Sequence, residues 1–314
     1  MAKDKKQSAF RTSIGGQALI EGVMMRGPDK QAIVIRDPDG NLIEKEEPIS
    51  INKSRLSKIP FIRGIVLFGS SMYNGVKALT YSAEFVPEEE QEAPSKLDEW
   101  IDRKFGSEKG MKLIMGIAVV IAVVMMVGLF ILLPTVLMGL TDGLALPRVA
   151  RNLLEALLRI GIFLLYLALV TRMKDIRRVF SYHGAEHKSI HCYEKGLPLT
   201  VENVRIQPRQ HPRCGTSFLF VVIIVSALVF SVVSWQNVWI RMLLRIALLP
   251  VVVGISYEIN RWVGRHDNPL SAVLSAPGKA LQGLTVFEPD DTMIEVGIRA
   301  LELVIPEKKG ADVW

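Results

Sequence analysis

Residues 113–133 read LIMGIAVVIAVVMMVGLFILL, an apolar run without a charged side chain. A helix needs about 20 apolar residues to cross the hydrocarbon core of a bilayer, so this run predicts a membrane-spanning helix. Apolar runs at about residues 153–171, 217–234 and 242–259 predict three further spans. A fully buried helix could produce one such run, but four of them favour an α-helical integral membrane protein.

Two of the predicted spans contain charged side chains. Glu155 and Arg159 are four residues apart in the second span, where opposite charges can pair on one helix face near the interface. Glu258 lies at the end of the fourth span. A carboxylate at membrane depth is costly and marks a functional site by default. Glu258 is therefore a candidate site residue, with a pair to Arg261 or Arg265 as the alternative.

Basic residues predict the orientation of the four spans. The connection between the second and third spans is much more basic than those at residues 134–152 and 235–241, and it contains Arg172, Lys174, Arg177, Arg178, Lys188, Lys195, Arg205, Arg209 and Arg213. The positive-inside rule places this 171–216 loop and both termini in the cytoplasm. The net charge of +6 is then mainly a topology signal. No nucleic-acid-binding motif accompanies it, so the expected partner is the cell membrane's lipid bilayer and not nucleic acid.

The predicted topology divides the chain into three parts. Residues 1–110 form an N-terminal cytoplasmic region, residues 111–260 the transmembrane bundle with the His-rich 171–216 loop, and residues 261–314 a cytoplasmic tail. Thr292 and Glu295 form a capping-box pattern at the start of one helix in this tail. Its apolar face is expected to dock on the rest of the cytoplasmic part, and consists of Met293, Ile294, Val296, Ile298 and Leu301.

A small β element is expected in the N-terminal region. Residues 16–25, 31–36 and 41–46 have the character of short strands, and Asp37-Pro-Asp-Gly40 is a turn between the last two. Residues 60–81 form an apolar segment with interspersed Gly and Ser. This segment predicts a helix lying on the membrane, or alternatively a buried helix packed closely through its small residues. The cytoplasmic part is therefore expected to be α+β.

A histidine-rich segment of the 171–216 loop carries the clearest chemical signal. It reads His183-Gly-Ala-Glu-His-Lys-Ser-Ile-His191 and holds three of the five histidines. They recur every fourth residue, which aligns them on one face of a helix. The first part is an H-x-x-E-H pattern, the reverse of the H-E-x-x-H zinc motif. The pattern indicates two imidazoles that hold a metal; the alternative is a basic amphipathic helix whose histidines face water or lipid headgroups.

Helix geometry limits which histidines share one ion. Residues eight apart are separated by roughly 12 Å along a helix axis, whereas zinc ligands lie ~2.0–2.1 Å from the ion. His183 and His191 are therefore not expected to share a metal. Either His183 and His187 bind it, with Glu186 as catalytic base, or His187 and His191 do. The first pair is preferred because it supplies the carboxylate.

Other candidate ligands lie in or beside the same loop. His211-Pro-Arg-Cys214 precedes the third span, and its three-residue separation is compatible with a shared metal. Cys214 could equally be a small apolar residue at a helix entrance. Glu258, at the cytoplasmic end of the fourth span, would be a third ligand from a distant helix. Cys192 and Cys214 both face a reducing compartment, so no structural disulfide is expected.

Four segments resemble the bacterial YqhQ family, and the resemblance covers most of residues 14–305: Gly15–Pro28, Tyr182–Lys188, His211–Ser217 and Gln282–Thr285. That family is a group of multi-pass membrane proteins of unknown function that are often described as metal-dependent enzymes. The resemblance implies the same topology and a metal site with the motif residues His183, Glu186, His187, His211 and Cys214. Glu258 joins them on the topological argument alone.

These patterns favour a metal-dependent, membrane-embedded enzyme, in the first place a hydrolase acting on a lipid or membrane peptide at the cytoplasmic face. His183 and His187 would hold zinc or a related divalent ion. Glu258, or the pair of His211 and Cys214, would complete the shell. Glu186 would take a proton from water at the metal.

Two other functions stay open. In a non-enzymatic scaffold or assembly factor, the metal would staple the 171–216 loop to the bundle. A transporter could use Glu258 and the histidines for protons or ions, but four spans with short outer loops disfavour it unless the chain forms a homo-oligomer. Catalysis needs an open coordination position, which a staple does not. The sequence does not specify a substrate.

Overall fold

The computed structural model describes residues 10–49, 56–86, 107–141, 147–212, 214–232, 238–266, 268–308 and 310–313. The chain forms two compact units. The first, called the sheet unit, comprises Met1–Val86, Leu167–Val225 and Pro250–Trp314. The second, called the apolar unit, comprises Pro87–Tyr166 and Ser226–Leu249.

The sheet unit is built on four antiparallel strands in sequence order: β1 (Gly15–Leu19), β2 (Gly22–Arg26), β3 (Lys30–Arg36) and β4 (Leu42–Pro48). The second and third predicted strands and the turn at residues 37–40 are confirmed. The prediction of one strand over residues 16–25 is wrong, because the chain reverses at Ile20–Glu21 and makes a hairpin. Glu21 has a φ of 52°, a conformation that side-chain periodicity does not reveal.

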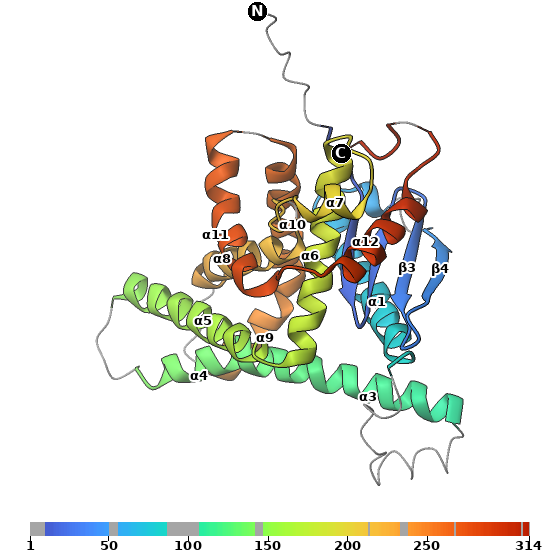
Figure 1. The fold of residues 1–314 in the computed structure, drawn as a ribbon. Coiled ribbons are helices and arrows are strands. Elements are labelled where there is room, and N and C mark those ends of the chain that lie inside the picture. Colours follow the sequence, from blue (N-terminus) through green and yellow to red (C-terminus); the bar gives the residue numbers. More distant parts are fainter. Residues whose placement is uncertain are drawn as a thin grey trace, which may run out of the picture. The chain divides into compact units, whose positions relative to one another are not determined.

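Helices cover both faces of the sheet (Figure 1). α6 (Lys174–Glu194) and α12 (Asp291–Val304) pack on one face, against a core that includes Val23, Met25 and Val34. α1 (Ile62–Ala83) contributes Ala78 to the core of the other face. Side chains of β3 are buried on both faces, which explains its continuous apolar sequence.

α12 docks on the sheet with its predicted apolar face, which is buried throughout. Its start differs from the predicted capping box. Asp290 is the N-cap, because its Oδ1 accepts the Met293 N–H at 2.9 Å and the Thr292 hydroxyl at 2.6 Å. Glu295 instead pairs with Arg36 of β3 at 2.6 Å. The carboxylate of Glu295, which the capping-box pattern assigned to the N-terminus of the helix, is therefore engaged in a tertiary ion pair with Arg36.

α1 confirms the helix predicted at residues 60–81. Its small residues make close contacts: a Cβ on Gly75 would lie 2.4 Å from the Gln17 side chain, and one on Gly64 would lie 2.7 Å from Tyr257. These contacts agree with the alternative of a helix packed through its small residues. Apolar side chains on other faces of the helix, such as Met72 and Tyr73, are exposed.

The remaining helices of the described residues are η2 (Leu56–Lys58), α3 (Ser107–Val127), the π-helical turn η4 (Gly128–Leu132), α4 (Leu133–Gly139), α5 (Arg148–Val170), α7 (Val201–Arg205), α8 (Gly215–Val232), α9 (Val238–Ala247), α10 (Leu249–Arg265) and α11 (Pro269–Thr285). α3, η4 and α4 follow one another directly, with η4 joining the two α-helices. α11 begins with a capping box made by Asn268 and Ser271.

Two stretches of the described chain are long and apolar enough to cross a membrane, Gly116–Gly139 and Ala150–Val170. They coincide with the first two predicted spans. The fourth predicted span is the pair Trp239–Ala247 and Leu249–Arg265, bent by 43°, which gives a third candidate if it is one span. Pro250 explains the bend, because proline lacks the N–H that would continue the helix. The third predicted span is a shorter apolar helix, Phe218–Ser231.

The apolar unit encloses a charged cluster. Arg159 donates to Glu155 at 3.1 Å, which confirms the predicted pair. Arg245 also binds this carboxylate, through both of its oxygens. Arg159 reaches Ser226 at 3.1 Å, and Arg245 reaches Thr135. All five side chains are buried, and the single carboxylate of Glu155 faces two guanidinium groups, so the cluster keeps a formal excess of one positive charge.

Candidate metal site

α6 presents the motif histidines on one helix face, as their four-residue spacing predicts. The ring centroids of His183 and His187 lie 4.4 Å apart. His211, from the segment after α7, extends this row, because its ring centroid lies 5.5 Å from that of His187 and 4.7 Å from that of His191. Four imidazole rings therefore form one continuous row.

One end of the row contains a first group of potential ligands, made by His183, His187 and Cys214. One ligand atom from each lies within 4.8 Å of the other two. His183 Nε2 is 3.2 Å from Cys214 Sγ. Cys214 is 7% exposed and His187 only 1% exposed, so both are shielded from water.

Backbone carbonyls fix the protons on these two imidazoles. His187 Nδ1 lies 2.6 Å from the carbonyl oxygen of Arg209, and His183 Nδ1 lies 3.1 Å from that of Thr285. A carbonyl oxygen only accepts hydrogen bonds, so each Nδ1 carries the proton and donates. In the neutral rings, each Nε2 then has its lone pair available. This is the arrangement by which proteins orient metal-binding histidines.

The Nε2 atom of His187 is buried and has no hydrogen-bond partner in the described part of the chain. Leaving such an atom unsatisfied costs about 1–3 kcal/mol. A zinc-like ion accepts imidazole nitrogen and thiolate sulfur, and would satisfy it. The backbone N–H of Thr216 donates to Cys214 Sγ at 3.4 Å, which orients the sulfur within the group. The donor set fits a tetrahedral ion with a fourth position for another ligand.

The other end of the row contains a second group, made by His191, Glu194 and His211. His211 Nε2 lies 3.6 Å from Glu194 Oε2. His191 Nε2 lies 2.8 Å from the carbonyl oxygen of Gln210, so it carries a proton and leaves Nδ1 with the lone pair. Burial lowers the pKa of His191, which favours its neutral form.

The two groups separate residues that the sequence placed together. The spacing of His211 and Cys214 was compatible with a shared metal, and the structure puts Cys214 in the first group and His211 in the second. Gln282 holds His211 in place, because its side chain accepts the His211 N–H at 2.9 Å and donates to its carbonyl oxygen at 2.8 Å. Gln282 belongs to the Gln282–Thr285 segment that resembles the YqhQ family, and this resemblance was the one sequence feature that pointed to it. Glu194 had no such signal.

Glu186 points to the sheet. The backbone N–H of Gly16 donates to its Oε1 at 2.9 Å, while its buried Oε2 has no partner among the described residues. Burial raises the pKa of this carboxyl, against the opposing effects of His183 and the Gly16 hydrogen bond. The carboxylate belongs to neither ligand group.

Glu258 also lies outside both groups. Its carboxylate binds the guanidinium of Arg63 through both oxygens and accepts the backbone N–H of Phe61 at 3.1 Å. Arg63 takes the place of the two partners, Arg261 and Arg265, that the sequence offered. The structure therefore places Glu258 in an ion pair between α1 and α10.

Comparison with known proteins identifies the family of this chain. The family profile "Protein of unknown function (DUF1385)" matches residues 59–307. The chain is 37% identical over 305 residues to "Uncharacterized protein YqhQ" of Bacillus subtilis (strain 168), covering 96% of this chain and 93% of that protein. No solved structure gives a significant match. The chain therefore belongs to the DUF1385 family, together with the YqhQ protein that the sequence motifs resembled.

Proposed function

We propose that this protein is a metal-dependent hydrolase at the cytoplasmic membrane, with a divalent ion held by His183, His187 and Cys214. The observation that carries the proposal is the buried Nε2 of His187, which has no hydrogen-bond partner among the described residues and lies beside the possible ligands His183 and Cys214. Three protein ligands leave a fourth tetrahedral position, which is the pattern of catalytic zinc sites. The candidate membrane helices support a lipid or membrane peptide as substrate.

A zinc-like ion in this site would supply Lewis-acid activation of water. The chain's own residues would prepare that chemistry. The carbonyls of Arg209 and Thr285 hold both imidazoles in the tautomer that binds through Nε2. Glu186 would move a proton, since its raised pKa brings a carboxyl closer to neutral pH and its Oε2 is unpartnered.

A metal-stapled scaffold is the second candidate. His187 and Cys214 are both buried, and a pocket of about 520 Å³ in the sheet unit is lined by His191 and Glu194 of the second group but by no residue of the first. A closed shell at the first group would link α6 to the segment before α8 and would not need an open position.

Metal content of the detergent-purified chain tests the site. We expect about one divalent ion per chain, lost in His183→Ala and His187→Ala because each removes a ligand. His266→Ala is the matched control, since His266 is exposed and stacks on Trp262. A natural chain without metal, or a His187→Ala chain that keeps it, would contradict the proposal.

Glu186→Gln separates the hydrolase from the scaffold. The amide keeps the size of the side chain but cannot accept a proton as a base. A hydrolase should keep its metal and lose about 10²–10⁴-fold in rate, measured as failure to complement a deletion strain. A scaffold should complement fully. Full complementation with normal metal content would reject the hydrolase.

Reporter fusions test the proposed topology. A reporter after residue 195 should behave as cytoplasmic and one near residue 143 as external, because the basic 171–216 loop is expected inside the cell. An external reporter after residue 195 would place the histidine row on the other side of the membrane and remove the proposed cytoplasmic site.

A further inference from the structure

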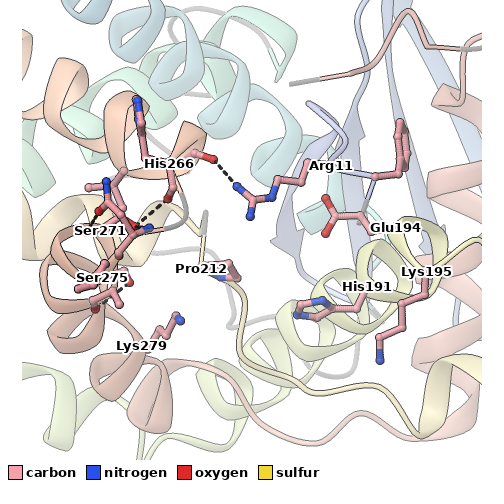
Figure 2. A pocket seen from close by; sticks show the side chains of 15 residues that line it. Arg11, His191, Glu194, Lys195, Pro212, His266, Ser271, Ser275 and Lys279 are labelled. Atoms are coloured by element: carbon pink, nitrogen blue, oxygen red, sulfur yellow. Dashed lines mark hydrogen bonds between the residues drawn. The ribbon is translucent and has the colours of Figure 1, made fainter. Parts of the chain in front are cut away.

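An open pocket of about 520 Å³ lies in the sheet unit, between the C-terminal end of α6 and the start of α11. Its size falls in the range of small-molecule sites. Figure 2 shows His191 and Glu194 on one side of the pocket and Lys279 and His266 on the other, with Arg11 extending between them. The pocket adjoins the second ligand group through His191 and Glu194.

The charged side chains of the pocket lining are mostly cationic. Arg11, Lys195 and Lys279 come from three separate segments, whereas Glu194 is the single carboxylate among the lining side chains of the described residues. Lys195 is bonded to a neutral partner, Gln207 Oε1, at 2.7 Å. Lys279 makes no ion pair with another described residue. Arg11 donates a hydrogen bond to the carbonyl oxygen of Gly264 at 3.5 Å. The pocket therefore carries excess positive charge.

The one carboxylate of the lining, Glu194, contacts groups on the neighbouring segments. Glu194 Oε1 accepts the backbone N–H of Thr12 at 2.9 Å, and its Oε2 lies 3.6 Å from His211 Nε2. Counted formally, three cations and this one carboxylate leave a net charge of +2 among the lining side chains of the described residues. A group with several acceptor oxygens could bind the cations from different segments at once, which is the chemistry of phosphate recognition.

Apolar groups complete the pocket. Phe10, Pro212 and Val263 line it beside the cations. A small inorganic anion would leave these apolar surfaces uncovered, whereas an amphiphile with a charged head would use both kinds of surface.

We propose that this pocket binds the phosphate group of a phosphate-bearing amphiphile, such as an anionic phospholipid. The cations hold the phosphate, and the apolar lining contacts the part of the ligand next to it. Binding does not require the metal. Calling this ligand the substrate rests on the proposed hydrolase function, because the pocket adjoins the histidine row.

Isothermal titration of the detergent-purified, chelator-treated full chain tests this inference. The probes are dihexanoylphosphatidic acid, dihexanoylglycerol as the matched probe without phosphate, and inorganic phosphate. We expect saturable binding of the phosphatidic acid and none of the dihexanoylglycerol. Lys279→Gln should weaken binding about tenfold or more, because it removes a charged partner of the phosphate. Lys308→Gln, an exposed lysine outside the pocket, should bind as the natural chain does.

The outcomes distinguish a lipid phosphate from a free phosphate compound, and they test the pocket separately from the proposed metal site. If inorganic phosphate binds as tightly as the lipid, phosphate recognition stands and a free phosphate compound is the ligand. Equal binding of dihexanoylglycerol, or unchanged affinity in Lys279→Gln, Lys195→Gln and Arg11→Gln, would overturn the inference. His187→Ala should still bind the lipid, so failure of the metal site and failure of the pocket give different results.

Discussion

Glu155 in the apolar unit and Glu186 in the sheet unit are both buried, 8% and 5% exposed, but their surroundings are opposite. Glu155 has two arginine partners, Arg159 and Arg245, and both of its oxygens are bonded. Among the described residues, Glu186 has no cationic hydrogen-bond partner: its Oε1 accepts a backbone N–H, and its Oε2 has no hydrogen-bond partner.

This difference separates a carboxylate that stabilises the fold, Glu155, from one that is a candidate for acid–base chemistry, Glu186. Buried charges are retained when they are paired, so Glu155 is suited to hold the helices of its unit together. Glu186 has to stay protonated over a wider pH range or meet a proton donor, which is the usual condition of an acid–base residue. The same substitution should therefore have opposite effects at the two positions.

Glu155→Gln should cause the largest loss of stability. The change leaves Arg159 and Arg245 buried without a counter-charge, and breaking a buried pair in this way costs about 3–5 kcal/mol. Unfolding of the purified chain in mixed micelles measures the loss. Arg245→Met is the matched control, because Glu155 keeps its pair with Arg159. A Glu155→Gln loss no larger than that of the control would show that the cluster does not depend on its carboxylate.

Gly16→Ala should have an intermediate effect. A Cβ at Gly16 would lie 2.6 Å from the Met24 carbonyl oxygen and 3.0 Å from the Glu186 carboxyl carbon. Overpacking of this kind costs about 1–3 kcal/mol, measured as a shift of the unfolding curve. Gly15→Ala is the control, since nothing lies within 4 Å of its Cβ position. Equal stability of the two variants would mean that neither the Met24 carbonyl nor Glu186 packs tightly against Gly16.

Glu186→Gln should have the smallest effect on stability, and the effect should depend on pH. The folded-state pKa of Glu186 is raised above its ordinary value of 4.5, so its stabilising contribution is complete below pH 4.5 and is lost as the pH rises through the folded pKa. The neutral amide lacks this loss. Unfolding of chelator-treated protein should show that the variant gains stability over the natural chain as the pH rises. A variant that is less stable at high pH would mean that the ionised carboxylate is stabilised in the fold.

Local sequence patterns predicted the helices and strands better than they predicted the tertiary contacts between them. The four-residue spacing placed the motif histidines on one face of α6, and the apolar pattern identified the buried face of α12. Two of the four predicted spans match helices long and apolar enough to cross a membrane, and a third matches a bent pair of helices. The hairpin at Glu21 was missed because its positive φ follows from tight strand pairing and leaves no mark on periodicity. The N-cap of α12 was misplaced because Arg36, distant in the sequence, pairs with Glu295.

The predicted set included His183, His187, His211 and Cys214 of the two ligand groups, but it missed Glu194 and the division into two groups. The motif spacing identified His183 and His187, because ligand positions on a single helix follow from geometry. Which of His211 and Cys214 joins them depends on the path of the segment between α7 and α8, and the contact with Gln282 fixes this path. Glu258 was included among the candidate ligands on the topological argument alone. Its ion pair with Arg63 depends on the packing of α1, which the sequence pattern does not show.

X-ray absorption at the zinc edge of the zinc-loaded chain tests the central claim most directly. The account predicts one sulfur scatterer at ~2.3 Å and nitrogen or oxygen scatterers at ~2.0–2.1 Å. Cys214→Ser should lose the sulfur scatterer, while Cys192→Ser should keep it, because Cys192 lies outside both ligand groups. Zinc bound by nitrogen and oxygen alone in the natural chain, or a sulfur scatterer that persists in Cys214→Ser, would contradict a site made by His183, His187 and Cys214.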